Sequence, residues 1–222
     1  MPPKKRSVDQ LADALGEHLR ESLLRMREAW EDQSVPPGFL VFPTKRNEAC
    51  RVSEQESKII AADWLRREQY PFSIETPTGE VFRQRGAKDL SALTDVTVYS
   101  HGRAGLGRIL NIELKAHQPN RESFRKDLEK LLREGVDGMW FHTLESADGA
   151  SWTAIGRKLW WSYRTLSADP KCRRAFQEQK HAVRFKFLVL RSGEIDFFAV
   201  RFAHWKADLG ERFPEVDFPV RN

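Results

Sequence analysis

The chain has 222 residues, of which 40% are hydrophobic and 31% are charged, and its formal net charge is +5. This balance is typical of a folded globular protein and excludes a disordered chain. No run of about 18 apolar residues is present and the first residues lack the apolar stretch of a signal peptide, so we expect a cytoplasmic protein without membrane contact. The two cysteines, Cys50 and Cys172, are too few for a disulfide framework and have no metal-like spacing.

An amphipathic helix is predicted over residues 7–30. Its apolar side chains recur every three or four residues, which places them on one face of the helix. We favour a helix docked on its own domain; a homodimer seam is the alternative. The segment DQSVPPGF, with two prolines and a glycine, ends the helix and predicts a linker to the main body. The apolar stripe consists of Leu11, Leu15, Leu19, Leu23, Met26 and Trp30.

A second helix is predicted over residues 53–68, because Ser53 and Glu56 match a capping box at its start. Short apolar segments after this helix predict strands, with PTG as a turn between the first two. The segment SHGRAGLGR joins two strands rather than opening a helix, so its glycines predict a hairpin loop and not a dinucleotide-binding turn. The predicted strands cover residues 72–76, 81–82, 92–99 and 109–116.

Helices and strands alternate again in the rest of the chain. NRESFRKDLEKLLREG is a strongly amphipathic helix with Asn120 as its cap, and GMWFHTL contains a strand at 139–143. Two more helices are predicted over residues 151–163 and 170–179. The segments VRFKFLVL and IDFFAVRF then predict two strands around an RSGE turn.

The order helix, three strands, helix, strand predicts an α/β fold with a mixed sheet flanked by helices. The helix between the strands at 109–116 and 139–143 is a crossover that joins two strands of one sheet. We expect three parts: an N-terminal helix and linker at 1–44, a core at 45–150, and a C-terminal helix–hairpin elaboration at 151–222 that packs on the core.

The segment NIELKAH, residues 111–117, places ionisable side chains in an otherwise apolar strand. Side chains two residues apart share a face, so Glu113 and Lys115 project together. Asp95, in LTDVTVY, lies on the preceding strand and is expected to converge with them. Two carboxylates, the Leu114 carbonyl and water suit Mg²⁺, with Mn²⁺ as a substitute. The alternative is an exposed strand face with a cross-strand ion pair.

These residues resemble the motif of the PD-(D/E)xK nuclease superfamily, which has the restriction-endonuclease-like fold. The matching pieces are Asp95 on one strand and Glu113 and Lys115 on the next, and the resemblance extends over about residues 50–145. Thr94 stands where the family has a proline. The resemblance implies metal-dependent hydrolysis of phosphodiester bonds, in which Asp95 and Glu113 hold Mg²⁺ and Lys115 positions the attacking water.

The family often adds an acidic residue from the helix that precedes the sheet. Glu56 is the predicted residue, because it lies three and four positions before Ile59 and Ile60 and so borders the buried face. Glu54 is the alternative. The capping box explains Glu56 equally well.

Polar and basic side chains near the site are candidates for contact with a nucleic acid. Gln118 follows the lysine, where the family frequently has a polar residue, and His117 is predicted on the Lys115 side of its strand. A sequence pI near 9.3 agrees with an anionic partner, and ordinary surface charge explains it equally well. The basic candidates are Arg83, Arg85, Lys88, Arg121, Arg125 and Lys126.

The resemblance implies an endonuclease that acts on DNA more readily than on RNA. The alternative is a non-catalytic subunit that binds a nucleic acid or another partner through a nuclease-like fold. A binding role alone favours basic side chains over buried carboxylates that face phosphate, so we favour the enzyme.

Overall fold

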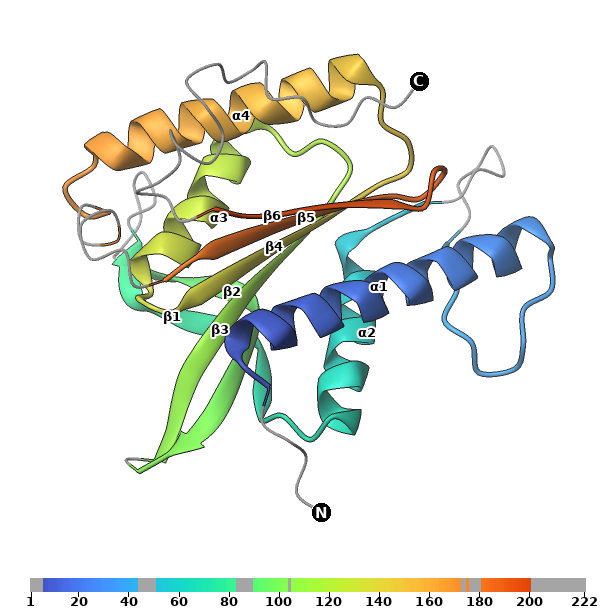
Figure 1. The fold of residues 1–222 in the computed structure, drawn as a ribbon, viewed down its shortest axis with the longest axis horizontal. Helices are drawn as coiled ribbons and strands as arrows, with labels where there is room; N and C mark the ends of the chain where they lie inside the picture. Colours follow the sequence, from blue (N-terminus) through green and yellow to red (C-terminus); the bar gives the residue numbers. More distant parts are fainter. Residues whose placement is uncertain are drawn as a thin grey trace.

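In the part of the chain that the structure describes, a six-stranded mixed sheet has helices on both faces (Figure 1). The computed structural model describes residues 6–43, 51–82, 90–103, 105–172, 175 and 181–200. This architecture confirms the predicted α/β class. The helices of the described residues are α1 (Val8–Glu31), α2 (Glu54–Arg67), α3 (Arg121–Arg133) and α4 (Gly149–Ala168), and the strands are β1 (Phe72–Phe82), β2 (Leu90–Gly102), β3 (Gly105–Ala116), β4 (Asp137–Leu144), β5 (Val183–Val189) and β6 (Glu194–Val200).

The strands lie in the sheet in the order in which they occur in the chain. β1, β2 and β3 are successive antiparallel neighbours, as are β5 and β6, whereas β4 is parallel to both β3 and β5. The two crossovers, through α3 and α4, therefore advance in the same direction along the sheet. Because such crossovers are right-handed, both helices lie on one face, and α1 and α2 cover the other (Figure 1).

Each face of the sheet has its own apolar core, because side chains alternate along every strand. Val96 and Ile112 point to the face where α1 and α2 pack. Trp140, Phe185 and Phe187 point to the face of α3 and α4. Since both faces are covered, a charged side chain in the middle of β3 is buried whichever way it points.

The apolar stripe of α1 belongs to the first of these cores. Leu11, Leu15, Leu19 and Leu23 are fully buried and Met26 is 2% exposed. The capping box of Ser7 and Gln10 begins the helix. The helix therefore docks on its own domain, as favoured from the sequence. The apolar stripe is thus covered within a single chain.

Two of the sequence expectations for the loops have different outcomes. The turn predicted at PTG is wrong, because β1 is one strand whose register shifts between Pro77 and Val81. β1 is an edge strand, where proline is tolerated because no neighbour needs its missing N–H. The glycine-rich loop is a hairpin as predicted, with Gly102 paired to Gly105. The helix predicted at 170–179 lies mostly outside the described residues.

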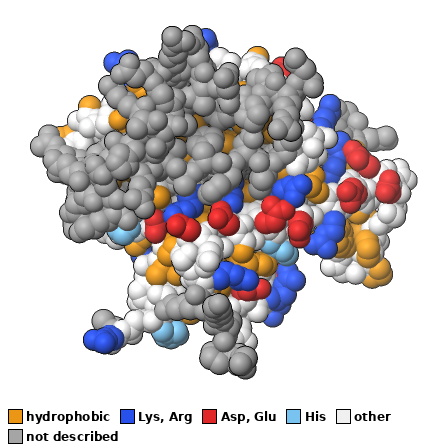
Figure 2. All heavy atoms as spheres, in the orientation of Figure 1, with side chains coloured by type: hydrophobic (Ala, Val, Ile, Leu, Met, Phe, Trp, Pro, Cys, Tyr) orange, Lys and Arg blue, Asp and Glu red, His pale blue; other side chains and the backbone are white. Residues whose placement is uncertain are grey.

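The surface of α1 carries both signs of charge. Figure 2 shows acidic and basic side chains side by side along this helix, and two of its pairs are Arg20–Glu17 at 2.5 Å and Arg27–Glu31 at 2.5 Å. The net positive charge of the chain is therefore not concentrated on α1. In the described part of the chain, no helix has both the length and the apolar composition that crossing a membrane requires.

Candidate functional site

β2 and β3 separate in the middle of the sheet. Their ladder ends at the pair Val96–Ile112. Before Val96, β2 pairs with β1, and after Ile112, β3 pairs with β4. We call this separation the strand fork. It leaves backbone groups on both strands without the partners that a continuous ladder would supply.

Side chains of the site bind the backbone groups that the strand fork leaves open. The Leu114 N–H donates to Asp95 Oδ2 at 2.9 Å, so Asp95 substitutes for the missing strand contact. On the other strand, the Leu93 carbonyl accepts from Lys130 Nζ at 2.9 Å. Two ionisable side chains thus bind backbone groups of both strands at the fork.

Three lysines reach the strand fork from three elements: Lys58 from α2, Lys115 from β3 and Lys130 from α3. Lys58 Nζ lies 3.0 Å from Asp95 Oδ1 and also pairs with Glu75. Because α2 and α3 cover opposite faces of the sheet, the fork is where charged groups from both faces meet. We call the following set the charged cluster: Glu54, Lys58, Glu75, Asp95, Glu113, Lys115, Asp127 and Lys130.

Glu113 and Lys115 are both buried, with 1% and 9% of their surface exposed. The alternative of an exposed strand face is therefore wrong. Lys115 Nζ lies 3.0 Å from Asp127 Oδ2 and 3.8 Å from both Glu113 Oε2 and Glu54 Oε1. Buried charges are costly unless they are paired, and these acids supply the pairing.

Burial is the largest cause of the shift in the pKa of Glu113. Desolvation raises the pKa of Glu113 to about 8, and the nearby charges of Asp127 and Asp95 act in the same direction. The ammonium groups of Lys130 and Lys115 act against this shift without cancelling it. Near neutral pH the carboxyl therefore holds a proton readily, and a cation that binds it displaces that proton.

Lys115 is a charged group in this setting. Burial by itself lowers the pKa of Lys115, but the surrounding carboxylates of Asp127, Glu113 and Glu54 outweigh burial and raise it above its ordinary value. A lysine in this state is suited to orient a water molecule or to stabilise developing negative charge, and it is a poor proton acceptor.

The acidic residue that α2 brings to the site is Glu54. Its carboxylate lies 3.8 Å from Lys115, and burial raises the pKa of Glu54. Glu56, the residue predicted from the sequence, instead accepts hydrogen bonds from the Ser53 backbone N–H at 3.0 Å and from its hydroxyl at 2.6 Å. The choice of Glu56 is thus corrected to Glu54, because the capping box occupies the Glu56 side chain.

The residues that follow Lys115 leave the strand. His117 is exposed and has a φ of +59°, so it does not continue the alternation that predicted it on the Lys115 side. Its carbonyl accepts a hydrogen bond from the buried ring of His142, and burial lowers the pKa of His142 to about 4. Gln118 is exposed beside the end of the strand.

The basic candidates are distributed over two regions. Arg83, Arg85 and Lys88 lie outside the described residues. On α3, Arg125 pairs with Glu129 at 2.8 Å and with Glu122 at 3.4 Å, which neutralises it within its own helix. Arg121 lies over the Trp161 ring at 4.0 Å, and Lys126 is exposed.

The charged cluster fits a magnesium ion in some respects and not in others. Among the described residues, no three acidic, histidine or cysteine side chains are arranged as a ready metal site. However, Mg²⁺ is often held by one or two carboxylates and several waters. Neither carboxylate oxygen of the buried Glu113 has a hydrogen-bond partner among the described residues, and Oε2, 3.8 Å from Lys115 Nζ, is less closely paired than Oε1, 2.8 Å from Lys130 Nζ. The Leu114 carbonyl points to the same side of β3 as its N–H, toward Asp95.

Four members of the charged cluster were not predicted from the sequence: Lys58, Glu75, Asp127 and Lys130. A signal for Asp127 was present, because it lies three residues after Phe124 and one before Leu128, on the apolar face of its helix. Lys58 lies four residues after Glu54, which places both on one side of α2. Ionisable side chains on the buried faces of flanking helices were thus the available indication.

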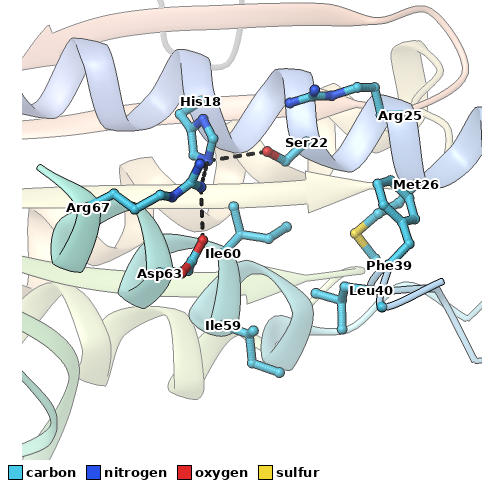
Figure 3. Close-up of a pocket in the computed structure, with 11 residues that line it drawn as sticks. His18, Ser22, Arg25, Met26, Phe39, Leu40, Ile59, Ile60, Asp63 and Arg67 are labelled. Atoms are coloured by element: carbon cyan, nitrogen blue, oxygen red, sulfur yellow. Dashed lines mark hydrogen bonds and ion pairs between the residues drawn. The ribbon is translucent and has the colours of Figure 1, made fainter. Parts of the chain in front are cut away.

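A separate pocket of about 490 Å³ lies between α1, α2 and the segment that follows α1 (Figure 3). Its lining is apolar at Met26 and Ile60 and polar at His18, where Arg67 and Ser22 contact the ring at 3.3 and 3.4 Å. Asp63 holds Arg67 at 2.9 Å. The pocket contains no member of the charged cluster.

Comparisons of the chain with family models, with curated proteins and with solved structures found no match.

Proposed function

We propose that the protein is a metal-dependent nuclease with a restriction-endonuclease-like core that hydrolyses phosphodiester bonds at the strand fork. The observation that carries this proposal is the convergence of Asp95 and Glu113 with Lys115 at a break in the sheet, where Glu113 is 1% exposed. A purely structural strand would have little reason to bury these charges, since apolar residues of similar volume are at least as stable.

The order of the elements supports the same proposal. α2, β1, β2, β3, α3 and β4 follow one another as in the PD-(D/E)xK core, with the acidic residue on β2 and the Glu–x–Lys pair on β3. Glu54 at the start of α2 supplies a further acid near Lys115. The proposal therefore rests on the position of the motif within the sheet as well as on the residue types of the motif.

The residues of the site have distinct roles in the proposed reaction. Asp95, Glu113 and the Leu114 carbonyl would hold Mg²⁺ or Mn²⁺, which supplies Lewis-acid polarisation of the phosphodiester. Lys115 orients the attacking water and stabilises the negative charge that develops on the phosphoryl oxygens. Water adds to phosphorus, the bond from phosphorus to the leaving oxygen breaks, and the products are a phosphate monoester and a hydroxyl group.

DNA is the proposed substrate, because the family resemblance includes enzymes of DNA restriction, repair and junction resolution.

The decisive assay incubates the protein with plasmid, single-stranded DNA and RNA in the presence of Mg²⁺, Mn²⁺ or a chelator. We expect metal-dependent cleavage of DNA that is reduced at least about 100-fold in Asp95→Asn and in Lys115→Met. Lys171→Met is the matched control, because Lys171 is exposed after α4 and is not part of the charged cluster, and it is expected to cleave normally. Binding without cleavage by the wild-type protein would contradict the proposal and favour a non-catalytic binding subunit.

A further inference from the structure

We infer that Lys130 acts as a built-in cation at the strand fork and limits the site to a single divalent metal ion. This inference rests on the proposed function, because it concerns the same carboxylates. Its basis is that the ammonium group of Lys130 occupies one oxygen-lined position while a second position beside it stays open.

The surroundings of Lys130 Nζ are those of a bound cation. Glu113 Oε1 and Asp127 Oδ1 lie at 2.8 Å, and the Leu93 carbonyl oxygen lies at 2.9 Å. These three oxygens come from β3, α3 and β2, so Lys130 links the two strands that separate at the fork. Lys130 Nζ donates a hydrogen bond to the Leu93 carbonyl and forms ion pairs with the two carboxylates.

The two oxygens of Glu113 are divided between this position and the open one. Oε1 forms a close ion pair with Lys130 Nζ at 2.8 Å, whereas Oε2 lies 3.8 Å from Lys115 Nζ, and neither oxygen has a hydrogen-bond partner among the described residues. The side chain is 1% exposed, so bulk water does not compensate for the missing partner. One carboxylate thus holds Lys130 closely through Oε1 and presents the more weakly paired oxygen, Oε2, on the other side.

The formal charge of the charged cluster matches one divalent ion. Its five carboxylates and three lysines leave a charge of −2 when all are ionised. One divalent ion balances this charge. A second ion would leave +2 in a buried site, which is more than the single charge of one phosphodiester neutralises.

The inference is tested by counting bound Mn²⁺ ions, with the electron paramagnetic resonance signal of free Mn²⁺ as the readout and no nucleic acid present. We expect one ion per chain in the wild-type protein. Two ions per chain would overturn the role of Lys130 and leave the proposed function standing. The absence of any bound ion would overturn the proposed function itself and the inference with it.

A second test of the inference removes the positive charge of Lys130. Lys130→Gln keeps hydrogen-bond donors but not the charge, and we expect it to bind a second Mn²⁺ ion and to hold the first about tenfold more tightly. Lys171→Gln, at an exposed lysine after α4, is the matched control and is expected to bind one ion with wild-type affinity. A Lys130→Gln protein that binds one ion with unchanged affinity would overturn the inference. If this variant does not fold, the wild-type count of bound ions still decides.

Discussion

Glu113 shows at the scale of one residue why the strand tolerates ionisable side chains. It is buried on a covered face of the sheet, yet its two oxygens have different surroundings, with Lys130 Nζ at 2.8 Å from Oε1 and Lys115 Nζ at 3.8 Å from Oε2. Burial raises the pKa of Glu113 to about 8. This environment is unfavourable for a structural carboxylate and suitable for one that exchanges a proton for a metal ion.

The raised pKa of Glu113 predicts a pH dependence of the metal-free protein. Between the ordinary carboxyl value of 4.5 and about 8, the folded state binds a proton that the unfolded state does not bind. The stabilisation is therefore complete below pH 4.5 and is lost as the pH rises through 8. Between pH 6.5 and 8, chelator-treated wild-type protein should lose at least about 1 kcal/mol more unfolding free energy than Glu113→Gln. The titration of His142 is common to both proteins and cancels in this comparison. Equal losses in urea unfolding would contradict the prediction.

The two acids at the start of α2 predict opposite consequences of substitution. Glu54→Gln removes a carboxylate beside Lys115, so it should weaken Mn²⁺ binding or cleavage at least several-fold with little loss of stability. Glu56→Ala removes the capping-box partner of Ser53, so it should lower the unfolding free energy by about 1 kcal/mol and leave metal binding unchanged. The same two measurements on both variants decide between the two acids. If Glu56→Ala lost metal binding and Glu54→Gln did not, Glu56 would be the acidic residue of the site, as predicted from the sequence.

At the scale of elements, α1 is fixed to the sheet by a lysine that crosses the helix. Lys186 on β5 is 4% exposed and reaches Asp13 at 3.0 Å. Its side chain passes directly over Gly16, where an added Cβ atom would lie 2.3 Å from Lys186 Cδ. Glycine inside a helix is normally unfavourable, so its presence here is explained by the space that the lysine needs.

This arrangement predicts that Gly16→Ala lowers the unfolding free energy when Lys186 is present and raises it when Lys186 is replaced by alanine. In the wild-type protein the added methyl group displaces Lys186, and the unfolding free energy should fall by about 1–3 kcal/mol. In a Lys186→Ala background the clash is absent, so the better helix propensity of alanine should stabilise the protein by about 0.5–1 kcal/mol. Thermal and urea unfolding of the four proteins in this double-mutant cycle test it. Stabilisation of equal size in both backgrounds would show that the lysine does not limit the helix.

Several elements were predictable because their signals are local. The capping box of α2, the Asn120 cap of α3 and the glycine hairpin depend on neighbours within a few residues, and the structure confirms them. The turn predicted within β1 was wrong for a non-local reason: Pro77 lies on an edge strand, and the sequence does not reveal which strand is at the edge.

At the scale of the whole molecule, α1 is part of the main core rather than an appendage. Its leucines contact the same cluster as α2 and the middle strands. β5 and β6 likewise extend the sheet alongside β4. The described segments before residue 45 and after residue 150 therefore share their cores with the segment between them.

This shared core predicts a large, concentration-independent loss of stability on substitution in α1. Leu15→Ala removes a fully buried side chain and should lower the unfolding free energy by about 2–5 kcal/mol. Ile59→Ala is the control, because Ile59 is 54% exposed on α2, and it should change stability by less than about 0.5 kcal/mol. The midpoint of thermal unfolding should not depend on protein concentration. A midpoint that rises with concentration would instead indicate that α1 is buried between two chains.

The sequence by itself determined the α/β class, most of the helices and strands, and the segment that carries Asp95, Glu113 and Lys115, because periodicity, caps and short motifs are local properties. Only the tertiary structure decided that Glu54 rather than Glu56 lies beside Lys115, and that Lys58, Asp127 and Lys130 join them. The physical reason is the strand fork: it brings together side chains from both faces of the sheet, and the distance between residues far apart in the chain is set by packing.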